Sequence, residues 1–323
     1  MIPNWIIQRS MLTPDRIAVR FEGQAWTYKE INELALQQAS KLVSLGIKPH
    51  DRVAIYATST PQIIFMICGC MHLQCEMVLL NLRLSKLELA YQIEDSEVVA
   101  ILAEDSLLEK LPKAEVQIYP FFKVSDTPPR KFTPMLEWNE EDTLTIMYTS
   151  GTTGFPKGVR QTVGNHVSNA TSSLYNTGLI EDDAWLCAVP LFHISGFSML
   201  CKCLLHGVRL ELYTKFDVKK IVDQLVDGTV TRMSVVAVTL ERILTELERR
   251  DKYVSDRFQT MLAGGGPVPI DYLKRAIERK IRVSQTYGMT ETASQTSTLS
   301  SEDALRKIGS AGKPLFFNQI RIA

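Results

Sequence analysis

LTIMYTSGTTGFPKG, residues 144–158, joins an apolar run to a loop that is rich in glycine and hydroxyl residues. Hydroxyls and unencumbered backbone N–H groups can surround phosphate oxygens, and Lys157 adds a positive charge. Flexible linkers often have this composition. A linker, however, does not need to leave an apolar strand directly or to carry Pro156 and Lys157 at its far side. The stretch therefore predicts a strand that ends in a phosphate-binding loop.

The Walker A sequence G-x-x-x-x-G-K-[ST], the other common phosphate loop, matches this stretch poorly. Pro156 precedes the lysine and Gly158 follows it, where Walker A requires a glycine and then a serine or threonine. A P-loop NTPase is therefore disfavoured.

Short apolar runs alternate with helical patterns on both sides of this loop. Capping boxes at Thr27/Glu30 and Ser85/Glu88 each open a predicted helix, and Pro61 opens a third. Strands are predicted over residues 52–57, 77–81, 98–103, 144–149, 185–190, 208–213, 233–238, 260–265 and 283–288. This alternation predicts the α/β class with parallel, doubly wound sheets.

Four prolines fall between Tyr119 and residue 140, in a stretch without clear periodicity. We interpret residues 111–140 as an irregular crossing between two α/β units. The first subdomain is predicted over residues 1–135. The second is predicted over residues 136–308 and would begin with the strand that carries the phosphate loop.

The composition excludes several classes of partner. Lysine plus arginine (36) balance aspartate plus glutamate (36), so no net field attracts nucleic acid or an anionic membrane. The six cysteines form no zinc ribbon and are interpreted as buried, reduced thiols. The N-terminus does not resemble a signal peptide, and His72, Gln74 and Glu76 interrupt the most apolar stretch. We expect small-molecule partners, no membrane insertion and a cytoplasmic location; the oligomeric state stays open, a homo-oligomer included.

Four segments, taken together and in this order, resemble the adenylate-forming superfamily of acyl-CoA synthetases, peptide-synthetase adenylation domains and luciferases. They are the loop at residues 148–158, LFHISG at 191–196, AGGGP at 263–267 and YGMTE at 287–291. The resemblance implies the large N-terminal domain of that fold. This domain would contain two doubly wound βα subdomains and, over residues 309–323, the start of a small β subdomain.

The resemblance also implies ATP, Mg²⁺ and coenzyme A as ligands. Tyr287 would flank the adenine and Thr290 would reach the α-phosphate. Thr149 and Glu291 would hold the Mg²⁺, a cation that prefers hydroxyl and carboxylate oxygens. The implied ATP-binding residues are Thr149, Ser150, Gly151, Thr152, Thr153, Gly154, Lys157, Gly264, Gly265, Gly266, Pro267, Tyr287, Gly288, Met289, Thr290 and Glu291.

His193, Lys157 and Thr290 are the implied catalytic residues, with His193 beside the reacting carboxylate. Candidate contacts to the acid are Arg83, His193, Ser195 and Ser198. Taken alone, the glycine turn, the acidic helix start and the histidine each have an ordinary structural explanation; their shared order favours the functional one. His166 and His206 are interpreted as structural.

Further stretches, among them PNWIIQRSMLTPDRIAV and IGSAGKPLF, are similar to the o-succinylbenzoate–CoA ligases of menaquinone biosynthesis, over residues 3–315. This similarity implies that an aromatic dicarboxylic acid attacks the α-phosphorus of ATP. An acyl-adenylate and pyrophosphate result, and the thiol of coenzyme A then displaces AMP. Because the acid is already ionised near neutral pH, positioning and charge neutralisation are needed more than a general base. Another acyl- or aryl-CoA ligase is the alternative.

Members of this family continue beyond the point where this chain stops, at residues 320–323. We therefore expect the ribose-binding TGD segment and the C-terminal lid domain with its adenylation lysine to be absent, by trimming or in nature. Lys313 lies in the GKP segment and does not replace that lysine. A binding-competent but catalytically impaired fragment is thus a second alternative. A mere scaffold is disfavoured, because it needs neither the hydroxyl loop nor Glu291.

Overall fold

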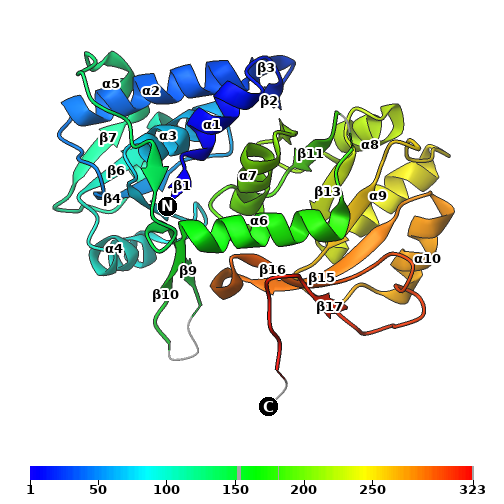
Figure 1. The fold of residues 1–323 in the computed structure, drawn as a ribbon. Coiled ribbons are helices and arrows are strands. Elements are labelled where there is room, and N and C mark those ends of the chain that lie inside the picture. The colour runs from blue at the N-terminus through cyan, green and yellow to red at the C-terminus, as the bar shows by residue number, and fades with distance from the viewer. Residues whose placement is uncertain (151–153, 181, 322–323) are drawn as a thin grey trace.

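Two mixed β-sheets organise the chain in the computed structural model, which describes residues 1–150, 154–180 and 182–321 (Figure 1). The first sheet has the order β10 (Lys157–Thr162), β9 (Thr143–Thr149), β5 (Glu76–Leu79), β4 (Arg52–Tyr56), β6 (Ala100–Ala103), β7 (Gln117–Pro120). Its strands run parallel except β10, which returns antiparallel to β9. The predicted α/β class is confirmed.

The second sheet contains the remaining long strands. Its order is β17 (Lys313–Pro314), β16 (Ser294–Leu299), β15 (Val283–Met289), β14 (Thr260–Ala263), β13 (Arg232–Val235), β11 (Ala184–Cys187), β12 (Arg209–Leu212), β2 (Ile17–Phe21), β3 (Gln24–Thr27). The centre is parallel, and both ends are antiparallel hairpins. A separate two-stranded sheet joins β1 (Ile2–Pro3) to β8 (Glu137–Trp138).

Helices connect the strands and cover the sheets. They are α1 (Trp5–Leu12), α2 (Tyr28–Ser44), α3 (Pro61–His72), α4 (Lys86–Asp95), α5 (Phe121–Asp126), α6 (Val163–Thr177), α7 (Ile194–His206), α8 (Val218–Asp227), α9 (Ala237–Arg249) and α10 (Ile270–Glu278), with 3₁₀ turns η1 (Asp105–Lys110) and η2 (Thr290–Thr292). Both predicted capping boxes are present. At α2, Glu30 accepts a hydrogen bond from the Thr27 backbone N–H (2.7 Å), and the Thr27 hydroxyl accepts one from the Glu30 N–H (3.2 Å).

We predicted that the strand carrying the phosphate loop begins the second unit, and this prediction is wrong. β9 pairs in parallel with β5, with Met77 opposite Thr145, so it belongs to the first sheet. Ile146 packs into one buried cluster and Met147 into another, so both faces of this strand are covered. Its two edges are paired as well, one with β5 and the other with β10. The boundary at residue 136 consequently does not separate the two sheets.

Two further segments depart from the expected organisation. The N-terminal strands β2 and β3 join the second sheet, where Val19 pairs with Leu210 of β12. Residues 111–140, expected to be irregular, contain β7 at the edge of the first sheet and the short helix α5. β17, from the segment expected to start a small β subdomain, pairs with β16 of the second sheet.

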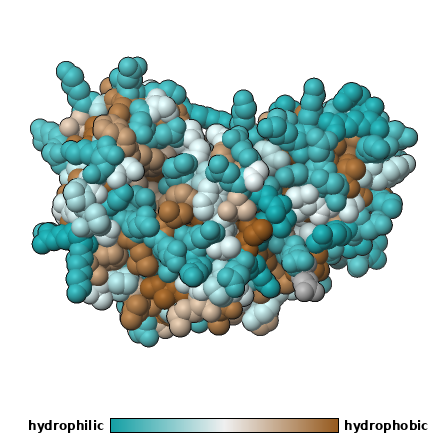
Figure 2. Space-filling model, turned by 90° about the horizontal axis from the view of Figure 1, so that it is seen from above, coloured by the Kyte–Doolittle hydropathy of each residue, from teal (hydrophilic) through white to brown (hydrophobic). Residues whose placement is uncertain are grey.

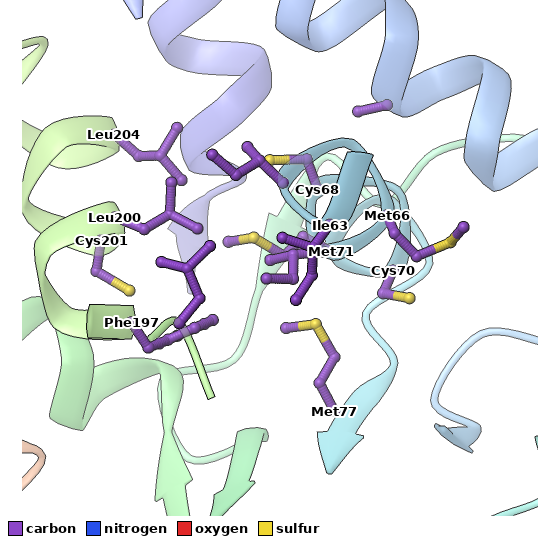
Figure 3. Close-up of a cluster of buried hydrophobic side chains, with 14 of the residues drawn as sticks. Ile63, Met66, Cys68, Cys70, Met71, Met77, Phe197, Leu200, Cys201 and Leu204 are labelled. Carbon is purple, nitrogen blue, oxygen red and sulfur yellow. The ribbon is translucent and has the colours of Figure 1, made fainter. Parts of the chain in front are cut away.

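One hydrophobic core contains side chains from both the first and the second sheet and from the helices that cover them. It includes side chains from α2, α3, α7, β5 and β12. In Figure 3, Ile63, Cys68 and Met71 of α3 face Phe197, Leu200 and Cys201 of α7. All six cysteines are free and buried, as predicted, and burial raises the pKa of the Cys68 thiol to about 12.

One face of the molecule is mainly polar. The face seen from above is covered mostly by hydrophilic side chains, with smaller hydrophobic patches between them (Figure 2). Among the helices that the structure describes, none has both the length and the apolar character needed to cross a membrane.

Candidate active site

The hairpin β9–β10 carries the phosphate loop away from the first sheet. Gly151, Thr152 and Thr153 lie outside the described residues, whereas Ser150, Gly154 and Lys157 on either side of them are exposed. Gly154 has a φ of 96°, a conformation that favours glycine. The described parts of the loop thus offer a hydroxyl and a lysine to solvent, as a phosphate site requires.

Helix α4 holds both arms of this hairpin. The Tyr91 hydroxyl donates a hydrogen bond to the Pro156 carbonyl (3.2 Å), and the Tyr91 ring lies 5.7 Å from that of Phe155. On the other arm, the Tyr148 hydroxyl donates to Asp95 (2.5 Å). Burial, followed by the hydrogen bond to Asp95, raises the pKa of Tyr148, which keeps the phenol protonated as a donor.

The two predicted magnesium ligands meet where the two sheets approach each other. Thr149 ends β9 of the first sheet, Glu291 lies in η2 of the second, and the Thr149 hydroxyl donates to a Glu291 carboxylate oxygen (3.2 Å). A hydroxyl and a carboxylate are suitable donors for Mg²⁺. The described residues form no group of three His, Cys, Asp or Glu side chains that could hold a metal. Phosphate oxygens would therefore have to complete the shell, as is usual for Mg²⁺ with nucleotides.

A cavity of about 430 Å³ lies beside the glycine turn. Gly265, Gly266 and Pro267 line it together with Tyr287 and Gly288, so five of the predicted nucleotide residues share one space. At Gly266 a Cβ would meet nothing within 4 Å. A flat ring could therefore approach the backbone there.

Gly288 has a structural reason to be glycine. A Cβ at this position would lie 1.9 Å from the Ser294 carbonyl oxygen of β16, a backbone atom. The close pairing of β15 and β16 therefore requires the glycine, whether or not a nucleotide is bound.

Gln285 also lines this cavity, and the sequence analysis missed it. Its side-chain nitrogen is buried and has no hydrogen-bond partner among the described residues. A buried unpaired donor is costly, and a ring nitrogen of a purine would satisfy it. The available signal was its position two residues before the predicted adenine contact Tyr287.

A second cavity, of about 270 Å³, adjoins the first and shares Gly265, Thr286 and Gly288 with it. Among the predicted residues, Ser195, Ser198, Gly264, Met289 and Thr290 line it. Five apolar residues form much of the remaining wall: Val189, Ile194, Val235, Val236 and Leu262. This space suits a ligand with an aromatic or aliphatic body.

Lys202 of α7 is the most informative residue of this second cavity, and sequence reasoning did not find it. It is 2% exposed, and its ammonium donates to the Gln295 side-chain oxygen (2.6 Å). None of the described carboxylates lies within ion-pair distance of it. Burial lowers the pKa of Lys202 to about 8, so it remains mostly protonated at neutral pH. A lone lysine in the apolar run MLCKCLL was the available signal.

His193 and Arg83 lie outside this cavity lining. His193 is the N-cap of α7, next to the lining residues Ile194 and Ser195. Burial, and secondarily the charge of Arg83, lowers the pKa of His193, so the imidazole is neutral at pH 7. Arg83 is exposed on the loop after β5. Arg83 therefore does not line the second cavity, contrary to its predicted contact with the acid.

The two histidines interpreted as structural differ in exposure. His166 is buried and His206 is half-buried, and burial lowers the pKa of each, to about 3 and about 4. Neither lines the two cavities of the site, which agrees with their structural interpretation.

Known proteins resemble the whole of this chain. A 2-succinylbenzoate–CoA ligase of Bacillus velezensis is 41% identical over 326 residues, covering 99% of this chain and 65% of that relative. The o-succinylbenzoate coenzyme A synthetase of Bacillus subtilis, solved with ATP and magnesium ion, is 38% identical with a TM-score of 0.93; 97% of this chain and 65% of that one are covered. The same synthetase with its acyl-adenylate intermediate has a TM-score of 0.92 at 38% identity, covering 97% and 64%.

The chain thus spans 65% of the length of the Bacillus velezensis relative. Its two sheets, its hairpin loop and the adjoining cavities all lie within the matched part. The profile of the family described as AMP-binding enzyme covers residues 8–323, and the chain therefore belongs to that family.

Proposed function

We propose that this chain supplies the ATP and acid site for the activation of o-succinylbenzoate. The succinyl carboxylate attacks the α-phosphorus of ATP, which releases pyrophosphate and leaves an acyl-adenylate. The thiol of coenzyme A then attacks the acyl carbon and AMP departs. The observation that carries this proposal is the buried cation of Lys202, which lines the second cavity and has no carboxylate within ion-pair distance among the described residues.

A dicarboxylic acid explains that cation. A buried charge is costly unless it is paired, and Gln295 offers only a neutral oxygen. The ring carboxylate of o-succinylbenzoate would pair with Lys202, while the apolar walls cover the ring. The shared lining of the two cavities leaves a path for the succinyl carboxylate toward Thr290. The printed names of the relatives, which concern the same acid, support this choice.

Charge neutralisation and placement are the contributions expected of the remaining residues. Lys157 and Thr290 would contact phosphate oxygens, and Thr149 and Glu291 would hold Mg²⁺, which supplies positive charge to the phosphates when it is bound. The neutral His193 would act by hydrogen bonding beside the acid. Gln285 and Tyr287 would contact the adenine. No proton has to be removed from the ionised acid.

The partners that we propose are small molecules: ATP, the aromatic dicarboxylic acid and coenzyme A. Balanced charge gives no support to a nucleic-acid or membrane partner. A cytoplasmic location is a proposal of the same kind, and the oligomeric state stays open, a homo-oligomer included.

Calorimetric titration tests the acid assignment. With Mg·ATP present, the chain is titrated with o-succinylbenzoate and with 4-oxo-4-phenylbutanoate, which lacks only the ring carboxylate. A charge-assisted bond to Lys202 predicts about 10- to 100-fold tighter binding of the dicarboxylate. Equal affinities would refute the proposed role of Lys202. Binding of a fatty acid without binding of o-succinylbenzoate would favour another acyl- or aryl-CoA ligase.

Single-turnover release of pyrophosphate separates complete from partial function. Adenylate formation by the chain would show that it carries out the first step. Tight binding of both ligands without pyrophosphate release would support the binding-competent but catalytically impaired alternative.

A further inference from the structure

Two parts of the nucleotide site come from different sheets and must keep a fixed relation. The phosphate loop belongs to the hairpin of β9 and β10 in the first sheet, whereas Thr290 and Glu291 lie in η2 after β15 of the second. The contact between Thr149 and Glu291 lies on the exposed side, where water competes for both groups. A buried contact between the same two elements would hold them more firmly.

Gln161 of β10 provides such a contact. It is 1% exposed, and its side-chain nitrogen donates to the main-chain carbonyl of Thr290 (2.9 Å). The pairing of β10 with β9 shifts register between Gln161 and Thr162. Irregularities of this kind redirect side chains out of the regular alternation of a strand.

A buried chain of hydrogen bonds fixes the orientation of the Gln161 amide. The amide nitrogen of Gln161 donates to the Thr290 carbonyl, so the amide oxygen points the other way and acts as an acceptor. The Thr145 hydroxyl donates to that oxygen (2.7 Å). That hydroxyl has one proton, so the 2.8 Å contact between Thr145 Oγ1 and His166 Nε2 requires the imidazole to donate. Donation therefore runs from His166 through Thr145 and Gln161 to Thr290.

The state of His166 fits this direction. Burial lowers the pKa of His166 to about 3, so the ring is neutral and carries one proton. Its Nδ1 is buried and has no partner among the described residues, as expected when the proton is on Nε2. Thr145 is fully buried between Gln161 and His166. Each link therefore has a single compatible donor arrangement.

We propose that Gln161 is a positioning residue that holds the turn of Thr290 and Glu291 in a fixed position relative to the β9–β10 hairpin, which carries the phosphate loop. This proposal rests on the proposed nucleotide site and assigns Gln161 a task in it. Gln161 donates its hydrogen bond to the Thr290 carbonyl, so it would act through Thr290 and Glu291 on the phosphates and Mg²⁺. Of the residues in this chain of hydrogen bonds, Thr290 alone lines the second cavity, where the acid is proposed to bind.

Substitution of Gln161 by methionine tests the proposal, because length and volume are nearly kept while both polar ends are lost. Loss of the hydrogen bond to the Thr290 carbonyl predicts about three- to tenfold weaker binding of Mg·ATP by calorimetry, with the affinity for o-succinylbenzoate unchanged. Thr145→Val should weaken Mg·ATP binding in the same direction. Thr145→Ser, which keeps the hydroxyl, should restore it. A role in packing alone would not produce this split or this rescue.

Gln74→Met is the matched control. Gln74 is also a buried glutamine, and its amide bonds to Asp142, away from the Thr290 turn. This variant should lose stability in urea denaturation and keep its affinity for Mg·ATP. Equal Mg·ATP affinities in Gln161→Met and the parent chain would overturn the proposal. Equal losses in Gln161→Met and Gln74→Met would overturn it as well.

Hydrogen exchange provides a readout that does not depend on nucleotide binding. In Gln161→Met, amides of a peptide containing residues 290–293 should exchange faster than in the parent, while those of β14 should not change. Unchanged exchange at residues 290–293 would contradict the positioning role even if the parent failed to bind Mg·ATP. That failure would instead count against the proposed function.

Discussion

Lys202 shows how one buried charge links the fold to the choice of ligand. Its ammonium is removed from water among residues of α7 and the second sheet. Its polar neighbours are the Gln295 oxygen (2.6 Å) and the Trp185 ring (5.4 Å). The Gln295 oxygen also accepts from the Ser173 hydroxyl (2.8 Å). The free protein thus carries an incompletely compensated cation, and an anionic ligand would compensate it.

Opposite pH effects on stability and on ligand affinity follow from this arrangement. Burial lowers the pKa of Lys202 from 10.5 to about 8, so the unfolded chain binds more protons between these values. The free energy of unfolding should therefore gain a rising contribution from Lys202 as pH increases from 8 toward 10.5. Affinity for o-succinylbenzoate should fall over the same range, because the ammonium proposed to pair with the ring carboxylate is lost.

Urea denaturation and calorimetry above and below pH 8 measure the two effects. Lys202→Met should show neither the pH-dependent gain of stability nor the pH-dependent loss of acid affinity. Lys86→Met, at an exposed position, is the control and should behave like the parent in both. An acid affinity of the parent that stays constant across pH 8 would contradict the pairing of Lys202 with the ligand.

Helix α4 is the element that holds the phosphate hairpin from outside the site. The Tyr91–Pro156 hydrogen bond and the Tyr91–Phe155 ring contact hold one arm, and the Tyr148–Asp95 bond holds the other. Tyr91→Phe removes only the hydrogen bond, whose loss should cost about 0.5–1 kcal/mol of stability. Tyr91→Ala removes the ring contact as well and should weaken Mg·ATP binding further. Urea denaturation and calorimetry of the two variants measure these steps; identical Mg·ATP affinities in all three chains would exclude a role of Tyr91 in nucleotide binding.

Local signals predicted the elements well, but not their partners. The capping boxes of α2 and α4 and the nine expected strands were found because caps and apolar runs are properties of adjacent residues. The sheet to which β9 or β2 belongs depends on contacts between residues far apart in the chain. In the same way, the glycine and hydroxyl pattern predicted the loop, whereas Lys202 and Gln285 became evident only through burial. The order of motifs could not reveal Gln161, because its role depends on a contact with Thr290, 129 positions away.

At the scale of the whole molecule, the first sheet does not consist only of N-terminal strands, nor the second only of later ones. β2 and β3 leave the N-terminal region to extend the second sheet, and β9 and β10 complete the first after residue 136. The shared core between α3 and α7 adds side-chain packing to this strand arrangement (Figure 3). The proposed nucleotide site lies where the two sheets approach, so its geometry would depend on both sheets being complete.

A polypeptide of residues 1–135, the first subdomain expected from sequence, should therefore not fold independently. It lacks β9, so β5 loses one of its two parallel partners and keeps only β4, and its β2–β3 hairpin has no β12 to pair with. Its α3 side chains would also lose their contacts with α7, which exposes apolar surface that the core otherwise removes from water. Near-ultraviolet circular dichroism and urea denaturation should show no cooperative transition, whereas the 323-residue chain should unfold cooperatively. A cooperative transition in residues 1–135 would show that its five α-helices and the four parallel strands β4, β5, β6 and β7 are sufficient, and that pairing with the later strands serves the site instead of the fold.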